Sequence, residues 1–226
     1  MQNINNRFGL KKVLYLILTF GFLTAVSQPF NNSRKNTPDE IKTLVAAKSE
    51  INPPRVISGE TEENKKREKE SAQAFIKAYR VFMHPRCMNC HPVGDAPLQG
   101  DDSHIHAQNV TRGPDGKGLY AMKCSNCHQP QHVPGENMPP GHALWHLPPA
   151  NRKMVFEGKS PAQLAAHFKD NNFTGFKDFK KEMLHHVEHE PLVLNSWTYG
   201  TPPPLSHEEF VAAVKEWIDK GAVIPK

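Results

Sequence analysis

Two short stretches, CMNCH at residues 87–91 and CSNCH at residues 124–128, decide how this 226-residue chain folds. Both have the pattern C-x-x-C-H, and together they contain all four cysteines of the chain. Four cysteines are too few to hold a protein of this length together as a disulfide scaffold. Because they occur in two copies of one pattern, we expect both copies to serve the same chemistry.

The C-x-x-C-H pattern is typical of covalent haem attachment. The two thiols add across the two vinyl groups of a haem, and the histidine that follows is placed under the iron as its proximal ligand. The sequence therefore predicts two covalently attached haem c groups. The predicted haem-binding thiols are those of Cys87, Cys90, Cys124 and Cys127, and the predicted proximal iron ligands are His91 and His128.

Two other interpretations of the cysteine pairs stay open. Four thiolates could bind one zinc ion, although the 33 residues between the pairs exceed the usual spacing of such sites. Two disulfides are a further alternative in an exported protein. Both alternatives treat the two histidines as coincidences. A histidine follows a given C-x-x-C about one time in twenty by chance, and two do so about one time in four hundred.

The N-terminus has the pattern of a secretory signal over residues 1–27. Three basic residues precede an apolar stretch at 13–26, and Ala25 and Ser27 provide the small residues expected before cleavage at Gln28. The apolar stretch has 14 residues, against about 20 needed to cross a bilayer. We therefore expect a periplasmic protein. Anchoring to the inner membrane is the alternative if the segment is not cleaved.

Composition and charge exclude several classes of protein. The mean hydropathy of −0.60 excludes a membrane protein with several spans. The formal net charge is +5, and removing the signal with its three positive charges leaves +2. The basic isoelectric point is therefore largely a property of the signal, and we expect no nucleic-acid partner.

The rest of the chain divides into a charged linker at 28–70 and a domain at 71–226. The linker has nearly balanced charges and too few apolar residues for a core, so we expect it to be flexible. The domain should begin with an amphipathic helix at 71–84, ended by Pro85. Residues 87–150 contain 16 Gly and Pro in 64 positions, which indicates long loops that need something other than backbone ladders to order them.

Three further helices are predicted after the loops. Capping boxes that begin at Ser160 and Ser206 open helices to about residue 169 and over 208–220, and the latter should stop at Gly221. Apolar spacing predicts another helix at 176–189. We see no alternation typical of strands, so the predicted fold class is mainly α with long loops.

From about Ala74 onwards, roughly two thirds of the chain resembles the small dihaem c-type cytochromes of Gram-negative bacteria. The resemblance rests on five stretches: PRCMNCHPVGD (85–95), HAQNVTRG (106–113), YAMKCSNCHQ (120–129), MPPGHALWHLPP (138–149) and HVEHEPLV (186–193). It implies a cytochrome c-like fold of short helices and Gly/Pro-rich loops wrapped around two haems. Some relatives are named as a subunit of isoquinoline 1-oxidoreductase, a molybdenum hydroxylase. No cysteine here is left for an iron–sulfur cluster, so any such enzyme would be a separate polypeptide.

A low-spin carrier needs a sixth ligand on each iron, and His or Met provides it. We expect His106 on the haem of the first motif, because it is the nearest plausible ligand after it and its His-x-x-Asn-Val pattern resembles the family's. We expect His186 on the haem of the second motif, because a helical wheel turns it towards the apolar face. Met138 and His146 are the reserve candidates. The alternatives are a solvated loop histidine for His106 and a core histidine for His186.

His185 and His189 lie four residues apart on the outer side of the same predicted helix. Such a pair could bind zinc, but without a glutamate at the second position it is a weak signal.

These observations predict a periplasmic carrier of single electrons rather than an enzyme. Its partners would be redox proteins, namely a donor such as a dehydrogenase or molybdenum hydroxylase and a terminal acceptor. Two alternatives remain at this point. One is a dihaem peroxidase or oxidase, and the other is a haem-based gas-binding module; both require an iron with an open sixth position.

Overall fold

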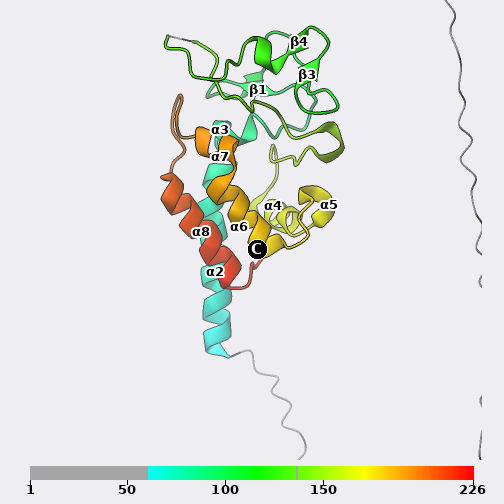
Figure 1. Cartoon of the computed structure of the whole chain (residues 1–226). Helices are drawn as coiled ribbons and strands as arrows, with labels where there is room; N and C mark the ends of the chain where they lie inside the picture. Colours follow the sequence, from blue (N-terminus) through cyan, green and yellow to red (C-terminus); the bar gives the residue numbers. More distant parts are fainter. Residues whose placement is uncertain (1–60, 136) are drawn as a thin grey trace, which may run out of the picture. The chain divides into compact units, whose positions relative to one another are not determined.

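The long helix α2 (Glu62–Phe82) and the C-terminal helix α8 (His207–Asp219) lie side by side and make the most extensive contact between two elements of the domain (Figure 1). The computed structural model describes residues 61–135 and 137–226. The predicted signal at 1–27 and the linker as far as residue 60 lie outside the described residues. No helix in the described part is long and apolar enough to cross a membrane.

The described residues are mostly helical, which confirms the predicted class of mainly α. The shorter helices are α3 (Pro85–Met88), α4 (Pro161–Phe168), α5 (Asn171–Thr174), α6 (Phe179–His189) and α7 (Pro191–Asn195). Single turns of 3-10 helix occur at Cys124–Asn126 and Ala150–Arg152.

The first helix begins at Glu62, earlier than the predicted 71–84. The charged run that we assigned to the end of the linker is therefore helical. The side chain of Thr61 caps the first turn, and the first two helical residues are acidic, which favours a helix N-terminus. Further along, the Glu70 carboxylate pairs with the ammonium group of Lys220 at 2.9 Å, which attaches this part of α2 to the end of α8.

Both predicted capping boxes form. The hydroxyls of Ser160 and Ser206 accept backbone N–H bonds at the starts of α4 and α8, and the third helical residue bonds back in each. Gly221 follows α8 with φ +114°, a conformation that favours glycine, as the stop signal predicts. Helix α6 begins at Phe179 rather than 176, because the Asp178 side chain caps it by accepting from the Lys181 backbone N–H.

An aromatic cluster forms the core between α2, α4 and α8. Phe82 lies at the centre of this cluster, and its ring centroid lies 4.7 Å from that of Phe168, 5.1 Å from Phe210 and 5.7 Å from Phe156. Trp217 of α8 packs against Phe75 with ring centroids 4.6 Å apart. Apolar burial therefore holds this half of the domain together, and Phe156 brings a loop residue into the same cluster.

The loop half contains two hairpins that the sequence does not reveal. Strand β1 (Leu98–Gln99) pairs with β2 (His104–Ile105), and β3 (Gly118–Leu119) pairs with β4 (Met122–Lys123), both antiparallel. Two-residue strands are too short to show alternation, which is why the sequence pattern misses them.

Side chains rather than ladders connect the loops. Arg112 is fully buried, and its guanidinium donates to the carbonyl oxygens of Pro148 at 2.6 Å and Gly94 at 3.3 Å. Arg112 thereby joins the segment that follows the first motif, at Gly94, to the segment at Pro148. This agrees with the expectation that 87–150 needs interactions other than regular secondary structure.

Replacing Phe82 by Ala should lower the free energy of unfolding by about 3–5 kcal/mol, because it removes a buried ring from the centre of the cluster. Ile76→Ala on the same helix is the matched control, since Ile76 is 41% exposed and should cost less than about 1 kcal/mol. Denaturant unfolding of the full chain measures both. Equal losses for the two variants would contradict the described core.

Candidate functional site

The first motif lies on and just after the short helix α3. His84 caps this helix and Pro85 occupies its first position, so the chain turns immediately before the two cysteines. The Nδ1 atom of His91 lies 2.7 Å from the carbonyl oxygen of Met154. The ring of His91 stacks on Phe156, with centroids 3.9 Å apart and planes 7° from parallel.

The second motif has the same surroundings although it lies in a different loop. The Nδ1 atom of His128 lies 2.7 Å from the carbonyl oxygen of Pro140. Its ring stacks on Trp145, with centroids 4.2 Å apart and planes 9° from parallel. Each motif histidine is therefore fixed by one carbonyl in the ring plane and one aromatic ring against its face.

This geometry determines which ring nitrogen can bind a metal. A carbonyl oxygen only accepts hydrogen bonds, so Nδ1 of each histidine must carry the proton and donate. The Nε2 atom then keeps its lone pair, which is the arrangement found in metal-ligating histidines. Burial lowers the pKa of His91 to about 3 and also lowers that of His128. Both rings are thus held in the neutral form that binds metals.

The carbonyl that orients His91 comes from a strained residue. Met154 has φ +48°, a left-handed conformation that costs free energy in a residue other than glycine. Such a conformation persists only where the surroundings impose it, and such positions cluster at functional sites.

The four cysteines are free thiols in this structure. Burial raises the pKa of Cys87 to about 12 and that of Cys90 to about 11, and it also raises the pKa of Cys124, while Cys127 is exposed. No group of three or more His, Cys, Asp or Glu side chains in residues 61–135 and 137–226 is arranged to hold one metal ion. The arrangement therefore offers no support for a four-thiolate zinc site.

His106 lies beside the second motif, whereas we predicted it for the haem of the first. Its ring centroid is 6.5 Å from that of His128, with 59° between the planes. Its Nδ1 atom is buried and has no hydrogen-bond partner among the described residues. His106 lies near His128 rather than near the first motif because the β1–β2 hairpin reverses the chain after that motif. Closeness in sequence therefore does not determine which motif histidine lies beside His106.

His186 is oriented as the helical wheel predicts. It is half-buried on α6 and its ring lies 5.9 Å from that of Phe176, whereas His185 and His189 are exposed. It also lies near enough to the first motif for its charge to contribute, after burial, to the lowered pKa of His91. We expect it on the haem of the second motif.

The reserve candidates differ in their surroundings. Met138 is 45% exposed in its loop. His146 borders a small cavity of about 20 Å³ that is also lined by Cys90, Trp145 and Tyr199. This cavity is far below the roughly 300–1,000 Å³ typical of sites for drug-sized ligands. A haem attached at Cys90 must therefore displace side chains that line it.

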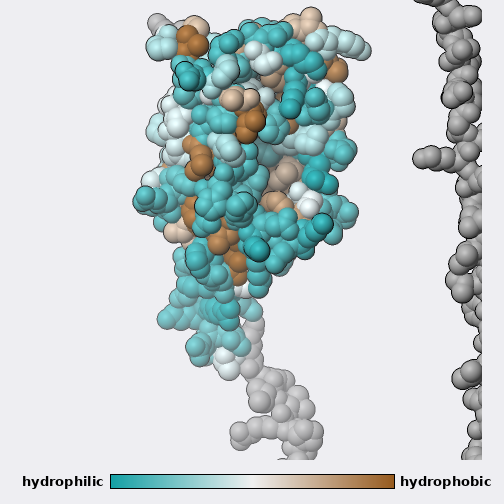
Figure 2. Space-filling model, in the orientation of Figure 1, coloured by the Kyte–Doolittle hydropathy of each residue, from teal (hydrophilic) through white to brown (hydrophobic). Residues whose placement is uncertain are grey.

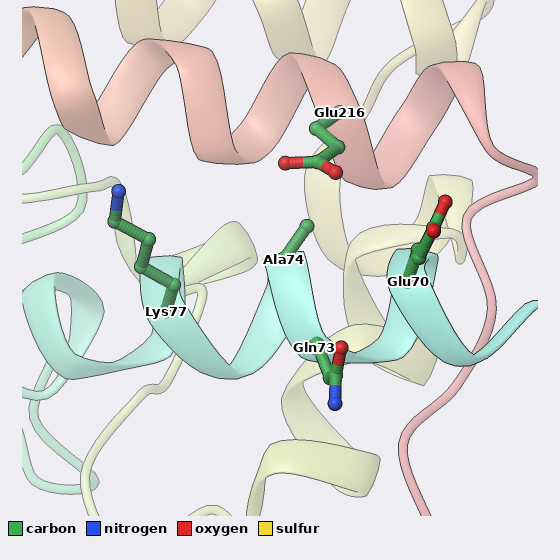
Figure 3. Close-up of a pocket in the computed structure, with 5 residues that line it drawn as sticks. All are labelled: Glu70, Gln73, Ala74, Lys77 and Glu216. Carbon is green, nitrogen blue, oxygen red and sulfur yellow. The ribbon is translucent and has the colours of Figure 1, made fainter. Parts of the chain in front are cut away.

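A larger hollow of about 210 Å³ lies between α2 and α8, away from the two motifs, and has a different lining (Figure 3). Its lining residues are Glu70, Gln73, Ala74, Lys77 and Glu216. No thiol or imidazole is among them, and Lys220 pairs with both carboxylates. The hollow therefore has no donors suited to a haem.

Apolar side chains reach the surface around the motifs. Seven of the ten large hydrophobic residues that are exposed in the described part lie between residues 93 and 144, including Tyr120 at 90% and Ile105 at 69%. Figure 2 shows brown patches over the loop end of the domain. Exposed apolar surface of this kind is typical of regions that bind a partner or a cofactor.

Comparisons with protein families, with curated proteins and with solved structures find no match for this chain.

Sequence reasoning missed the residues that orient the two motif histidines. Two of them act through backbone carbonyls, at Pro140 and Met154, and a carbonyl has no residue-type signal. The stacking rings of Trp145 and Phe156 are visible as aromatics in the sequence, but nothing in their spacing connects them with the motifs.

Gly141 holds the Pro140 carbonyl in place, and Gly141→Ala should disturb it. A Cβ at this position would lie 2.1 Å from the carbonyl oxygen of Gln131, so the backbone must shift. We expect a loss of about 1–3 kcal/mol in the free energy of unfolding. Gly94→Ala is the control, because its Cβ would meet nothing closer than 3.9 Å. Thermal unfolding of both variants measures the difference, and equal stabilities would contradict the tight contact.

Proposed function

We propose that the protein is an exported dihaem c-type cytochrome that transfers single electrons in the periplasm. One haem is attached through Cys87 and Cys90 with His91 as proximal ligand. The other is attached in the same way at the second motif, with His128 as proximal ligand. The distal ligands come from His106 and His186, with Met138 and His146 in reserve.

The observation that carries this proposal is the matched environment of His91 and His128. Two histidines 37 positions apart each follow a C-x-x-C pair, donate Nδ1–H to a carbonyl at 2.7 Å and stack on one aromatic ring. A disulfide would need neither the oriented imidazole nor its neutral form. A metal ligand needs both.

When bound, the haem iron supplies one-electron oxidation and reduction. The residues of the chain attach the haem, orient its ligands and limit its contact with water. The cysteines hold the porphyrin, the two carbonyls keep each proximal Nε2 directed at the metal, and the stacked rings of Phe156 and Trp145 exclude water from one face of each imidazole. The loops then form a cytochrome c-like wrapping of low polarity around the two groups.

The proposed partners are proteins that donate and accept electrons. A separate dehydrogenase or molybdenum hydroxylase would deliver electrons, and a terminal acceptor would remove them. The apolar side chains exposed between residues 93 and 144 belong to the loop segments that carry both motifs, and they are the proposed docking surface for such partners.

Intact mass tests the attachment directly. Matured in a host that exports and attaches haem, each chain should carry two haems and begin at Gln28, because two C-x-x-C-H motifs follow a cleavable signal. A mass with no haem or one haem, together with zinc in metal analysis, would overturn the proposal. Rapid CO binding by the ferrous protein together with peroxide consumption would instead favour the peroxidase or gas-binding function.

Cys127→Ser tests the structural role of the haem. Cys127 is exposed, so the substitution alone should change the free energy of unfolding by no more than about 0.5 kcal/mol. If the haem orders the loops, the variant should lose more than about 2 kcal/mol together with the second haem, because ligand binding adds to stability. Ser125→Ala within the same motif is the control and should keep both haem and stability. Native protease resistance and an unchanged Tm in a Cys127→Ser chain without its second haem would contradict this role.

A further inference from the structure

We propose that His106 is the distal ligand of the haem attached at the second motif, so that a residue following the first motif closes the second haem site. This inference rests on the proposed function. It reverses the order that the sequence suggests, in which each motif takes the nearest ligand after it.

The distance between His106 and His128 matches two ligands of one iron. Two imidazoles on opposite sides of a metal, each bonded at about 2.0 Å, have ring centroids roughly 6.3 Å apart. The observed separation is 6.5 Å. The angle of 59° between the rings is compatible with this, because each ring can rotate about its own bond to the metal without changing the separation.

His185 and His189, one helical turn apart on α6, have centroids 4.8 Å apart. Rings in direct contact span a wider range, as Phe75 and Phe82 do at 6.3 Å, so the separation of His106 and His128 is compatible with a metal between them but does not by itself require one. His128 already has its Nδ1 occupied by the Pro140 carbonyl, so its Nε2 is the atom left for the iron.

His106 also retains an uncommitted ring nitrogen. Its Nδ1 is buried without a hydrogen-bond partner in the part of the chain that the structure describes, which is costly for a polar atom. A metal bound at Nδ1 would remove that cost. His104, two residues earlier, does not share this property, because its Nδ1 pairs with the Asp102 carboxylate at 2.6 Å.

The pairing joins the two haem sites into one unit. His106 follows β2, and its backbone N–H donates to the carbonyl of Pro97 at 3.0 Å, while Asn89 in the first motif donates to the carbonyl of Gly100 at 2.9 Å. The hairpin that bears the ligand of the second haem is thus bonded to the first motif.

The test uses two backgrounds that each keep one haem. Cys87→Ala/Cys90→Ala keeps the second haem, and Cys124→Ala/Cys127→Ala keeps the first. Adding His106→Ala should convert the remaining haem to high spin and open it to CO only in the background that keeps the second haem. His104→Ala is the matched control and should leave both backgrounds low spin. Electron paramagnetic resonance and visible spectra report the spin state.

The outcomes separate the two proposals. High spin only in the background that keeps the first haem would overturn the pairing and restore the order suggested by the sequence. No change in either background, with a sulfur–iron charge-transfer band that Met138→Ala abolishes, would assign the methionine instead. Absence of covalent haem from the unsubstituted protein would overturn the proposed function itself, whatever His106 does.

A measurement on the intact two-haem protein covers the case in which a one-haem background does not fold. Trp145 stacks on His128, so its indole N–H signal in nuclear magnetic resonance reports the spin state of the second iron. His106→Ala should convert about half of the low-spin haem and shift this signal strongly. The signals of Trp197 and Trp217 in the helical core should move much less. Trp145 also lines the cavity at Cys90, so the ring signals of Phe156, which stacks on His91, are the comparison: a larger shift at Phe156 than at Trp145 would place His106 on the first haem.

Discussion

The hydrogen bond from a histidine Nδ1–H to a backbone carbonyl, made once at each C-x-x-C-H motif, is the constraint on which the arrangement of the loops depends. It requires Met154 to lie against His91 and Pro140 to lie against His128, although 63 and 12 positions separate these pairs. The loop that carries each carbonyl must return to its motif, which excludes most other paths for these segments. The strained backbone of Met154 is one cost of that return.

The domain is stabilised in two different ways at its two ends. The helical end is stabilised by apolar burial, because α2, α4 and α8 enclose the cluster around Phe82 and Trp217. The loop end is held by polar bonds to carbonyls, of which those from the buried Arg112 are the clearest. Burying a guanidinium costs free energy unless its donors are satisfied, and its Nε has no partner among the described residues. The loop end is therefore the part whose order depends most on additional interactions.

Local signals in the sequence predicted where most of the longer helices lie, whereas contacts between distant segments could not be predicted from it. The capping boxes at Ser160 and Ser206 act within four residues, so the sequence contains all the information they need. The start of α2 at Glu62 was placed too late although local signals were present, because Thr61 caps the first turn and the first two helical residues are acidic. The ion pair between Glu70 and Lys220, by contrast, joins residues 150 positions apart and could not be predicted from the sequence. The same limit applies to the candidate site. The motifs were visible as patterns, whereas the neighbours of His106 and His186 follow from how the loops fold back.

The neighbour of His106 differs from the one that sequence order suggests, and the difference has a physical reason. A rule that gives each motif the next suitable histidine assumes that the chain continues away from the motif, as it does in a helix. Here the chain turns back at Gly100, where φ is +76°, and the β1–β2 hairpin is bonded to Asn89 beside the first pair of thiols. A residue at the far end of such a hairpin faces whatever lies across it, and that neighbour is His128. In a domain whose loops are fixed by single polar bonds, the partner of a ligand is set by those bonds and not by its distance along the chain.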